Sequence, residues 1–203
     1  MIRGIPLRSF VVPVALALAG SAVALAPRQD PGARAFSGER DRKSTHVSWY
    51  GTNVALGQAN IDYGPAVWKD AYDALLDDLV GSRWRLGADD WTTLDTNMPL
   101  VFDGLEIAPG EYYLAVARDS DGAYELEFLD PDPIRRMRLD AAWVDRAPTG
   151  PRAPLEHDTL DERAERLRIT LSAPQAGRTG WLLIEFGPHE LSIPVETSPG
   201  PGK

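Results

Sequence analysis

The sequence of 203 residues contains no cysteine. This absence excludes a disulfide scaffold, thiol catalysis, an iron–sulfur cluster, a cysteine-based zinc site and a lipid-modified amino-terminal cysteine. The apolar share of 43% and the charged share of 25% are those of an ordinary soluble globular protein. Packed apolar side chains must therefore hold the fold without covalent cross-links.

Basic residues are fewer than acidic ones. The chain has 21 lysines and arginines against 30 aspartates and glutamates, a formal net charge of −9. Nucleic-acid binding depends on cations that neutralise phosphates, so we expect no nucleic-acid partner. Residues 70–132 hold 16 acidic side chains and only 3 basic ones. A solvated acidic surface is the interpretation that we favour for this imbalance, and a cationic partner in the cell envelope is the alternative.

The motifs of several enzyme classes are missing as well. The three histidines, His46, His157 and His189, form neither an H-E-x-x-H motif nor any other i, i+4 pair. No G-x-S-x-G elbow, Walker A sequence or dinucleotide fingerprint occurs. We therefore expect no structural metal and no cofactor. His189 falls in a predicted turn, where we expect it to be exposed.

The amino terminus has the layout of a secretory signal peptide. Arg3 and Arg8 precede an apolar run over residues 10–19, and the small residues Ala22 and Ala24 follow it. This A-x-A pattern predicts cleavage before Leu25 and export to the periplasm or the medium. An uncleaved anchor over residues 9–26 is the alternative, but its 18 residues are near the lower limit for a membrane span. After cleavage we expect no stable membrane span.

Composition divides the rest of the chain. Residues 25–44 are rich in proline, glycine and charge and predict a disordered linker. Residues 197–203 predict a disordered tail. The domain itself is expected over residues 45–196.

Short apolar alternations within residues 45–196 predict nine or ten strands. Residues 111–118 and 123–129 flank an Asp/Gly loop and predict a hairpin, with Gly122 available for positive φ. A second hairpin is predicted from residues 180–186 and 190–195, with a turn at 187–189. Together these patterns predict a mainly β fold: a single antiparallel β-sandwich or barrel-like domain with one packed amphipathic helix.

That helix is predicted near residues 66–80. Apolar pairs recur there every four residues, with Pro65 suited to the first turn and Gly81 to the end. Packing over one open face of the sandwich is the interpretation we favour, and a partner-binding helix is the alternative. Residues 146–156 contain several prolines and glycines and predict a long surface loop.

Three ordered motifs resemble one bacterial family. They are I-D-Y-G-P at residues 61–65, W-R-L-G-A at 84–88 followed by Thr92-Thr93, and P-G-E-Y-Y-L at 109–114. The set resembles the exported family catalogued as domain of unknown function 2911, over roughly residues 45–195. The resemblance implies a β fold and export, whereas the activity of that family is unknown.

Two departures from the family pattern concern its polar positions. The family arginine before the proline is Gly64 here, and the family's Asn-Glu-Ala is replaced by residues 89–91, Asp-Asp-Trp. Any site that used that arginine in relatives is lost in this chain.

The best candidate site in the sequence is a polar and aromatic cluster. An arginine beside carboxylates, hydroxyls and an indole can bind a polar ligand by bidentate hydrogen bonds and ring stacking. The ligand-binding residues that we predict are Trp84, Arg85, Asp89, Asp90, Thr92 and Thr93. The alternative is structural, with Arg85 paired to Asp89 or Asp90 and with Trp84 and Trp91 in the core.

Two classes of function follow from this cluster. The favoured one is a non-catalytic binding or interaction module for a polar small molecule, a glycan or a cationic envelope partner. The other is a hydrolase acting on extracellular carbohydrate, in which Asp89 or Asp90 would act with a distant carboxylate such as Glu106 or Glu111. A hydrolase requires two facing carboxylates across a cleft, and a binding module requires an exposed tryptophan beside Arg85.

Overall fold

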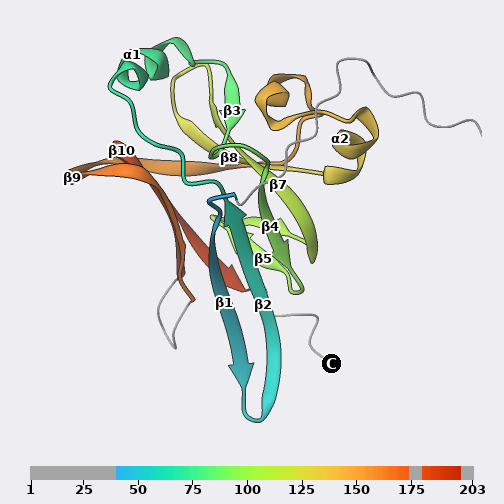
Figure 1. Cartoon of the computed structure of the whole chain (residues 1–203). Coiled ribbons are helices and arrows are strands. Elements are labelled where there is room, and N and C mark those ends of the chain that lie inside the picture. The colour runs from blue at the N-terminus through green and yellow to red at the C-terminus, as the bar shows by residue number, and fades with distance from the viewer. Residues whose placement is uncertain (1–39, 174–179, 198–203) are drawn as a thin grey trace, which may run out of the picture. The chain divides into compact units, whose positions relative to one another are not determined.

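A computed structural model describes residues 40–173 and 180–197 (Figure 1). The predicted signal peptide, most of the predicted linker and tail residues 198–203 lie outside the described residues. Of the linker, residues 40–44 are described, and strand β1 begins at Lys43. Thr197 is the last residue of the last strand.

The predicted mainly β fold is confirmed. Ten strands form one antiparallel, open sheet in the described part of the chain. Short strand β3 (Arg83–Arg85) pairs only with β7. The other strands follow one another in the order β1 (Lys43–Gly51), β2 (Val54–Tyr63), β4 (Thr92–Thr96), β7 (Gly110–Arg118), β8 (Tyr124–Leu129), β9 (Arg152–Leu171), β10 (Gly180–Thr197), β5 (Leu100–Phe102) and β6 (Leu105–Ile107).

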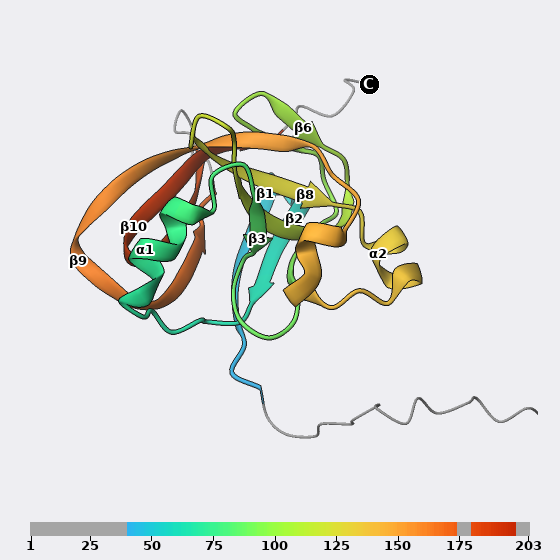
Figure 2. The same ribbon diagram turned by 90° about the horizontal axis from the view of Figure 1, so that it is seen from above.

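The sheet curves around one main core. Figure 2 shows the long strands β9 and β10 bending around the side where helix α1 (Ala71–Asp78) lies. Strand β7 is buried on both faces: Leu114 and Val116 enter the main core, and Tyr113 and Ala115 face a second cluster. Burial on both faces explains why the sequence of β7 is a nearly continuous apolar run.

The second cluster is covered by helices that the sequence patterns did not predict. These are α2 (Pro131–Met137) and the 3₁₀ segment η1 (Ala141–Arg146). Ile134 of α2 and Val144 of η1 are buried against the outer face of β7. The sheet is therefore covered on this side as well.

Helix α1 confirms the predicted helix but is shorter than residues 66–80. Val67 forms an isolated antiparallel bridge with Arg166 of β9, and the Trp68 amide donates to the Glu165 carbonyl at 2.9 Å. These contacts, with the bond from the Leu167 amide to the Ala66 carbonyl, hold residues 66–68 beside β9. The helix therefore excludes them: Asp70 is its N-cap, and α1 begins at Ala71.

One predicted hairpin is confirmed and the other is wrong. Strands β7 and β8 pair through the predicted loop, where Gly122 has φ +86°. The predicted turn at residues 187–189 is instead part of β10, which continues to Thr197 and pairs with β9 on both sides of this point. The register shifts at Gly187, with φ +60°, so this glycine forms a bulge. Similarly, the loop predicted over 146–156 ends early, because β9 begins at Arg152.

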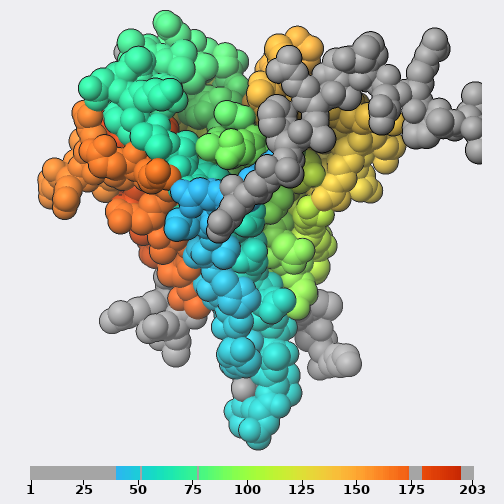
Figure 3. Space-filling model, in the orientation of Figure 1, coloured from blue at the N-terminus to red at the C-terminus, as the bar shows by residue number. Residues whose placement is uncertain are grey.

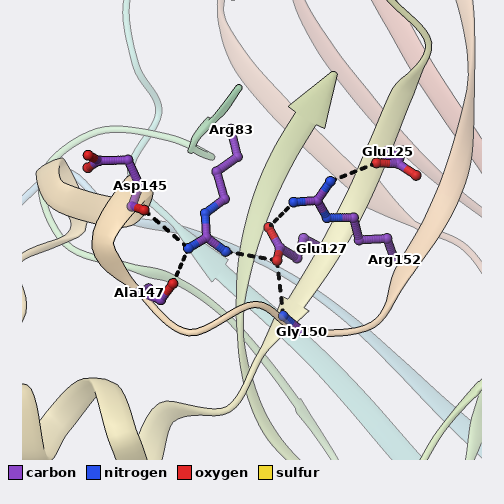
Figure 4. Close-up of polar contacts among 7 residues, drawn as sticks. All are labelled: Arg83, Glu125, Glu127, Asp145, Ala147, Gly150 and Arg152. Carbon is purple, nitrogen blue, oxygen red and sulfur yellow. Dashed lines mark hydrogen bonds and ion pairs between the residues drawn. The ribbon is translucent and has the colours of Figure 1, made fainter. Parts of the chain in front are cut away.

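A buried ionic network ties the segment after η1 to the sheet (Figure 4). Glu127 of β8 is fully buried and accepts from Arg83 at 2.8 Å and from the Gly150 amide at 3.0 Å. Arg152 lies 3.4 Å from its other carboxylate oxygen and also pairs with Glu125 at 3.0 Å. Arg83 further donates to the carbonyl of Ala147. Every polar group of Glu127 thus has a partner, as a buried charge requires.

The hairpin of β1 and β2 extends beyond the neighbouring strands (Figure 3). Its tip exposes apolar side chains: Tyr50 is 74% exposed, Val54 56% and Leu56 61%. Its base is anchored in the main core by Val47 and Ile61.

Candidate ligand-binding cavity

A cavity of about 570 Å³ lies between α1 and the concave side of the sheet. Its walls come from the segment before α1, from α1 itself, from β3 and the loop after it, and from β7, β8, β9 and β10. The volume falls in the range of about 300–1,000 Å³ that is typical of small-molecule sites. The bend of β9 and β10 and the position of α1 create this space together.

Aromatic rings dominate one wall of the cavity. Trp68 is 6% exposed and packs edge-to-face against Tyr72 at 5.6 Å and against Phe186 at 4.9 Å between ring centroids. Its indole lies against the backbone of Gly187, where an added Cβ would stand only 2.3 Å from the ring. The bulge in β10 therefore makes room for Trp68.

The Trp68 indole also carries an unsatisfied donor. Its Nε1 is buried, and no described residue accepts its proton. An unpartnered buried donor costs free energy, and the wall of a ligand cavity is a place where such a group can later find an acceptor.

A smaller cavity of about 370 Å³ adjoins the first, and Leu76, Tyr124 and His189 line both. His157 and His189 are hydrogen-bonded there, with 3.0 Å between Nε2 and Nδ1. Asp73 of α1 lies 3.8 Å from His189 Nε2, which is beyond hydrogen-bond distance. The second cavity is therefore more polar than the first.

Both histidines are held towards the neutral form. Burial lowers the pKa of His189, and the neighbouring His157 lowers it further, against a smaller opposing effect of Asp73. Burial and the nearby Arg118 guanidinium lower the pKa of His157. A neutral pair fits the geometry, because one imidazole must donate and the other accept. His189 is part of this pair, so the expectation of a merely exposed histidine in a turn is wrong.

Two polar contacts fasten α1 over the cavity. Arg118 donates to the Leu76 carbonyl at 2.6 Å, and Arg163 pairs with Asp70 at 2.6 Å. Arg118 also donates to the Gly122 carbonyl at 2.9 Å, which fixes it against the β7–β8 turn. The helix is thus held at both ends, while its side chains Tyr72 and Leu76 line the cavity.

Two residues of the predicted cluster line the main cavity. Trp84 is half-buried and packs edge-to-face against Tyr124, with 6.3 Å between ring centroids. Arg85 is half-buried and donates to the Asp89 carbonyl at 3.1 Å, so it contacts the backbone and not the carboxylate. This part of the predicted site does lie beside a cavity.

The other four predicted residues are not among the described residues that line it. Asp89 has φ +62° at an exposed turn, and Asp90 pairs with Arg40. Thr92 is buried and its Oγ1 donates to the Leu86 carbonyl, whereas Thr93 is half-buried on β4. The structure therefore does not bring the six residues together at one surface.

Several cavity residues escaped the sequence analysis. The sequence pattern predicts Trp68 within the amphipathic helix and His189 in a turn. No motif spacing includes His157. His157 and His189 meet because β9 pairs with β10, and Trp68 joins them because its segment is bonded to β9. Trp68 and Tyr72, four residues apart, show a shared helical spacing, whereas nothing in the sequence links them to Phe186.

Comparisons with protein-family models, curated proteins and solved structures found no match to this chain. The resemblance to domain of unknown function 2911 accordingly stays a prediction. Within the described ranges, no cluster of three or more potential metal ligands occurs, and no helix has the length and apolarity needed to cross a membrane.

Proposed function

We propose that this chain is an exported, non-catalytic binding domain whose small-molecule ligand occupies the main cavity beneath α1. The apolar, aromatic cavity between α1 and the sheet carries this proposal. Cavities of this volume with a few polar groups in an apolar wall are the usual form of small-molecule sites. The apolar walls favour a ligand with an apolar body over the polar glycan expected from the sequence.

The hydrolase alternative lacks a supporting observation. Neither Asp89 nor Asp90 lines a described cavity, and Asp73 is the one carboxylate among the described residues that line the smaller cavity. A pair of carboxylates facing each other across a cleft is what glycoside hydrolysis requires. The binding proposal needs no such pair.

A neutral apolar dye tests the binding proposal. Nile red should bind the purified protein at one saturable site, with a rise in its fluorescence. Leu76→Trp should weaken that binding about tenfold or more, because the larger side chain projects from α1 into the cavity.

The matched control is Leu56→Trp, which makes the same change on the exposed β1–β2 hairpin away from the cavity. It should leave the affinity unchanged. No saturable binding, or equal effects of the two variants, would reject the cavity as the site.

Export has its own test. Intact-mass analysis of the protein recovered from its native host should give a chain that begins at Leu25, because Ala22 and Ala24 provide the small residues required before the cut. Ala24→Arg should leave the precursor uncleaved. Recovery of the unaltered protein from membranes with Met1 retained would contradict the cleavage and support anchoring.

A further inference from the structure

The charged side chains that line the main cavity are positive, whereas the net charge of the chain is negative. The chain is strongly acidic, and residues 70–132, which include α1, are its most acidic part. Yet among the described residues that line the main cavity, the charged ones are Lys69 and Arg85, and none is an aspartate or glutamate. These two cations make the electrostatic potential at the cavity more positive than over the rest of this acidic protein.

These two cations are not neutralised by the protein. No ion pair of Lys69 or Arg85 with a described carboxylate is formed, and the hydrogen bond of Arg85 goes to a neutral carbonyl. By contrast, Arg163, next to the start of α1, is paired with Asp70. Positive charge beside an apolar wall is therefore available to an anionic ligand.

An unsatisfied donor also lies in the aromatic wall. Trp68 Nε1 is buried without a hydrogen-bond partner in the described structure, whereas His189 Nε2 already has the Asp73 carboxylate 3.8 Å away. Trp68 directly precedes Lys69 in the chain, at the entry to α1. A carboxylate has acceptor sites on both oxygens, so one ligand group can pair with a cation and accept a hydrogen bond from the indole.

Resting on the proposed function, we infer that the ligand is an anionic amphiphile, a single alkyl chain ending in a carboxylate. The alkyl chain fills the aromatic and aliphatic cavity beneath α1, and the carboxylate meets Lys69 and Arg85. The net charge of the protein repels such an anion from the rest of the surface, which confines binding to this site.

The test compares dodecanoate with dodecanol as competitors of Nile red, each below the concentration at which it self-associates. The two ligands share the alkyl chain and differ in the charged end. Dodecanoate should bind about tenfold or more tightly than dodecanol, and the preference should shrink as salt screens the charges. Lys69→Gln and Arg85→Gln together should abolish the preference while dodecanol still binds.

The control is the double variant Arg136→Gln with Arg138→Gln, which removes the same two charges from exposed residues that do not line the cavity. It should keep the preference. Equal affinity for the two ligands, or a preference that survives the substitution of Lys69 and Arg85, would overturn the anionic ligand and leave the cavity proposal standing. Failure of Nile red itself to bind would overturn both.

Discussion

Glu127→Gln should lower the free energy of unfolding by about 3–5 kcal/mol, the largest single effect that we expect. The substitution keeps the shape of the side chain and removes its charge. Arg83, whose side chain is 8% exposed, would then be left as a buried cation without its carboxylate (Figure 4). Urea unfolding followed by tryptophan fluorescence measures the loss.

Glu125→Gln is the matched control two residues along the same strand. Among the described residues, its carboxylate pairs with Arg152 alone, and the side chains of Glu125 and Arg152 are 27% and 32% exposed. An ion pair of this kind contributes about 1 kcal/mol or less. Equal losses in the two variants would show that burial does not decide the strength of the network.

Glu127 also links segments that are far apart in the sequence. Its two oxygens join β3, β9 and the segment after η1 to β8. Gly150 is required beside it, because an added Cβ would stand 1.8 Å from the Phe128 carbonyl oxygen. The face of the sheet opposite the cavity is thus fixed by polar contacts as well as by the second core cluster.

Local patterns predicted the strands well where the paired segments are near each other in sequence. The β7–β8 hairpin follows from two alternating runs and from a glycine able to adopt positive φ. The same rule failed in β10, where Gly187 and Pro188 resemble a turn. There the pairing of a long β9 with β10 outweighs the local signal, and a bulge accommodates both residues.

Local patterns likewise predicted the helices only in part. The amphipathic period predicted α1, but its start depends on the bridge between Val67 and Arg166, which no local pattern contains. The two helical segments that were missed do have local signals. Asp130 caps α2 with Pro131 in its first turn, and Asp140 caps η1. They are too short for a recognisable apolar period.

The candidate site was predictable only in part for the same reason. Trp84 and Arg85 were found because they lie in a distinctive run, and both line the cavity. Trp68 and His189 became neighbours through the folding of the sheet, with 5.6 Å between their ring centroids. An apolar cavity depends on the spacing between layers of the fold, which a single sequence does not show.

Gly187→Ala should test the connection between the bulge of β10 and the cavity. The new Cβ would stand 2.3–2.4 Å from three atoms of the Trp68 ring, at a residue with φ +60°. A left-handed backbone costs an alanine about 1–2 kcal/mol, and displacing a packed side chain costs about 1–3 kcal/mol more. We expect a total loss of about 2–5 kcal/mol in urea unfolding.

Gly104→Ala separates the two causes of that loss. Gly104 has φ +83° in the turn between β5 and β6, and nothing lies within 4 Å of an added Cβ. It should therefore show the backbone cost alone and leave Nile red binding unchanged. Gly187→Ala should in addition weaken dye binding about tenfold, because Trp68 must move from its place in the cavity wall. If the two variants lose the same stability and bind the dye equally, Trp68 does not rest on Gly187, and the wall of the cavity is formed differently.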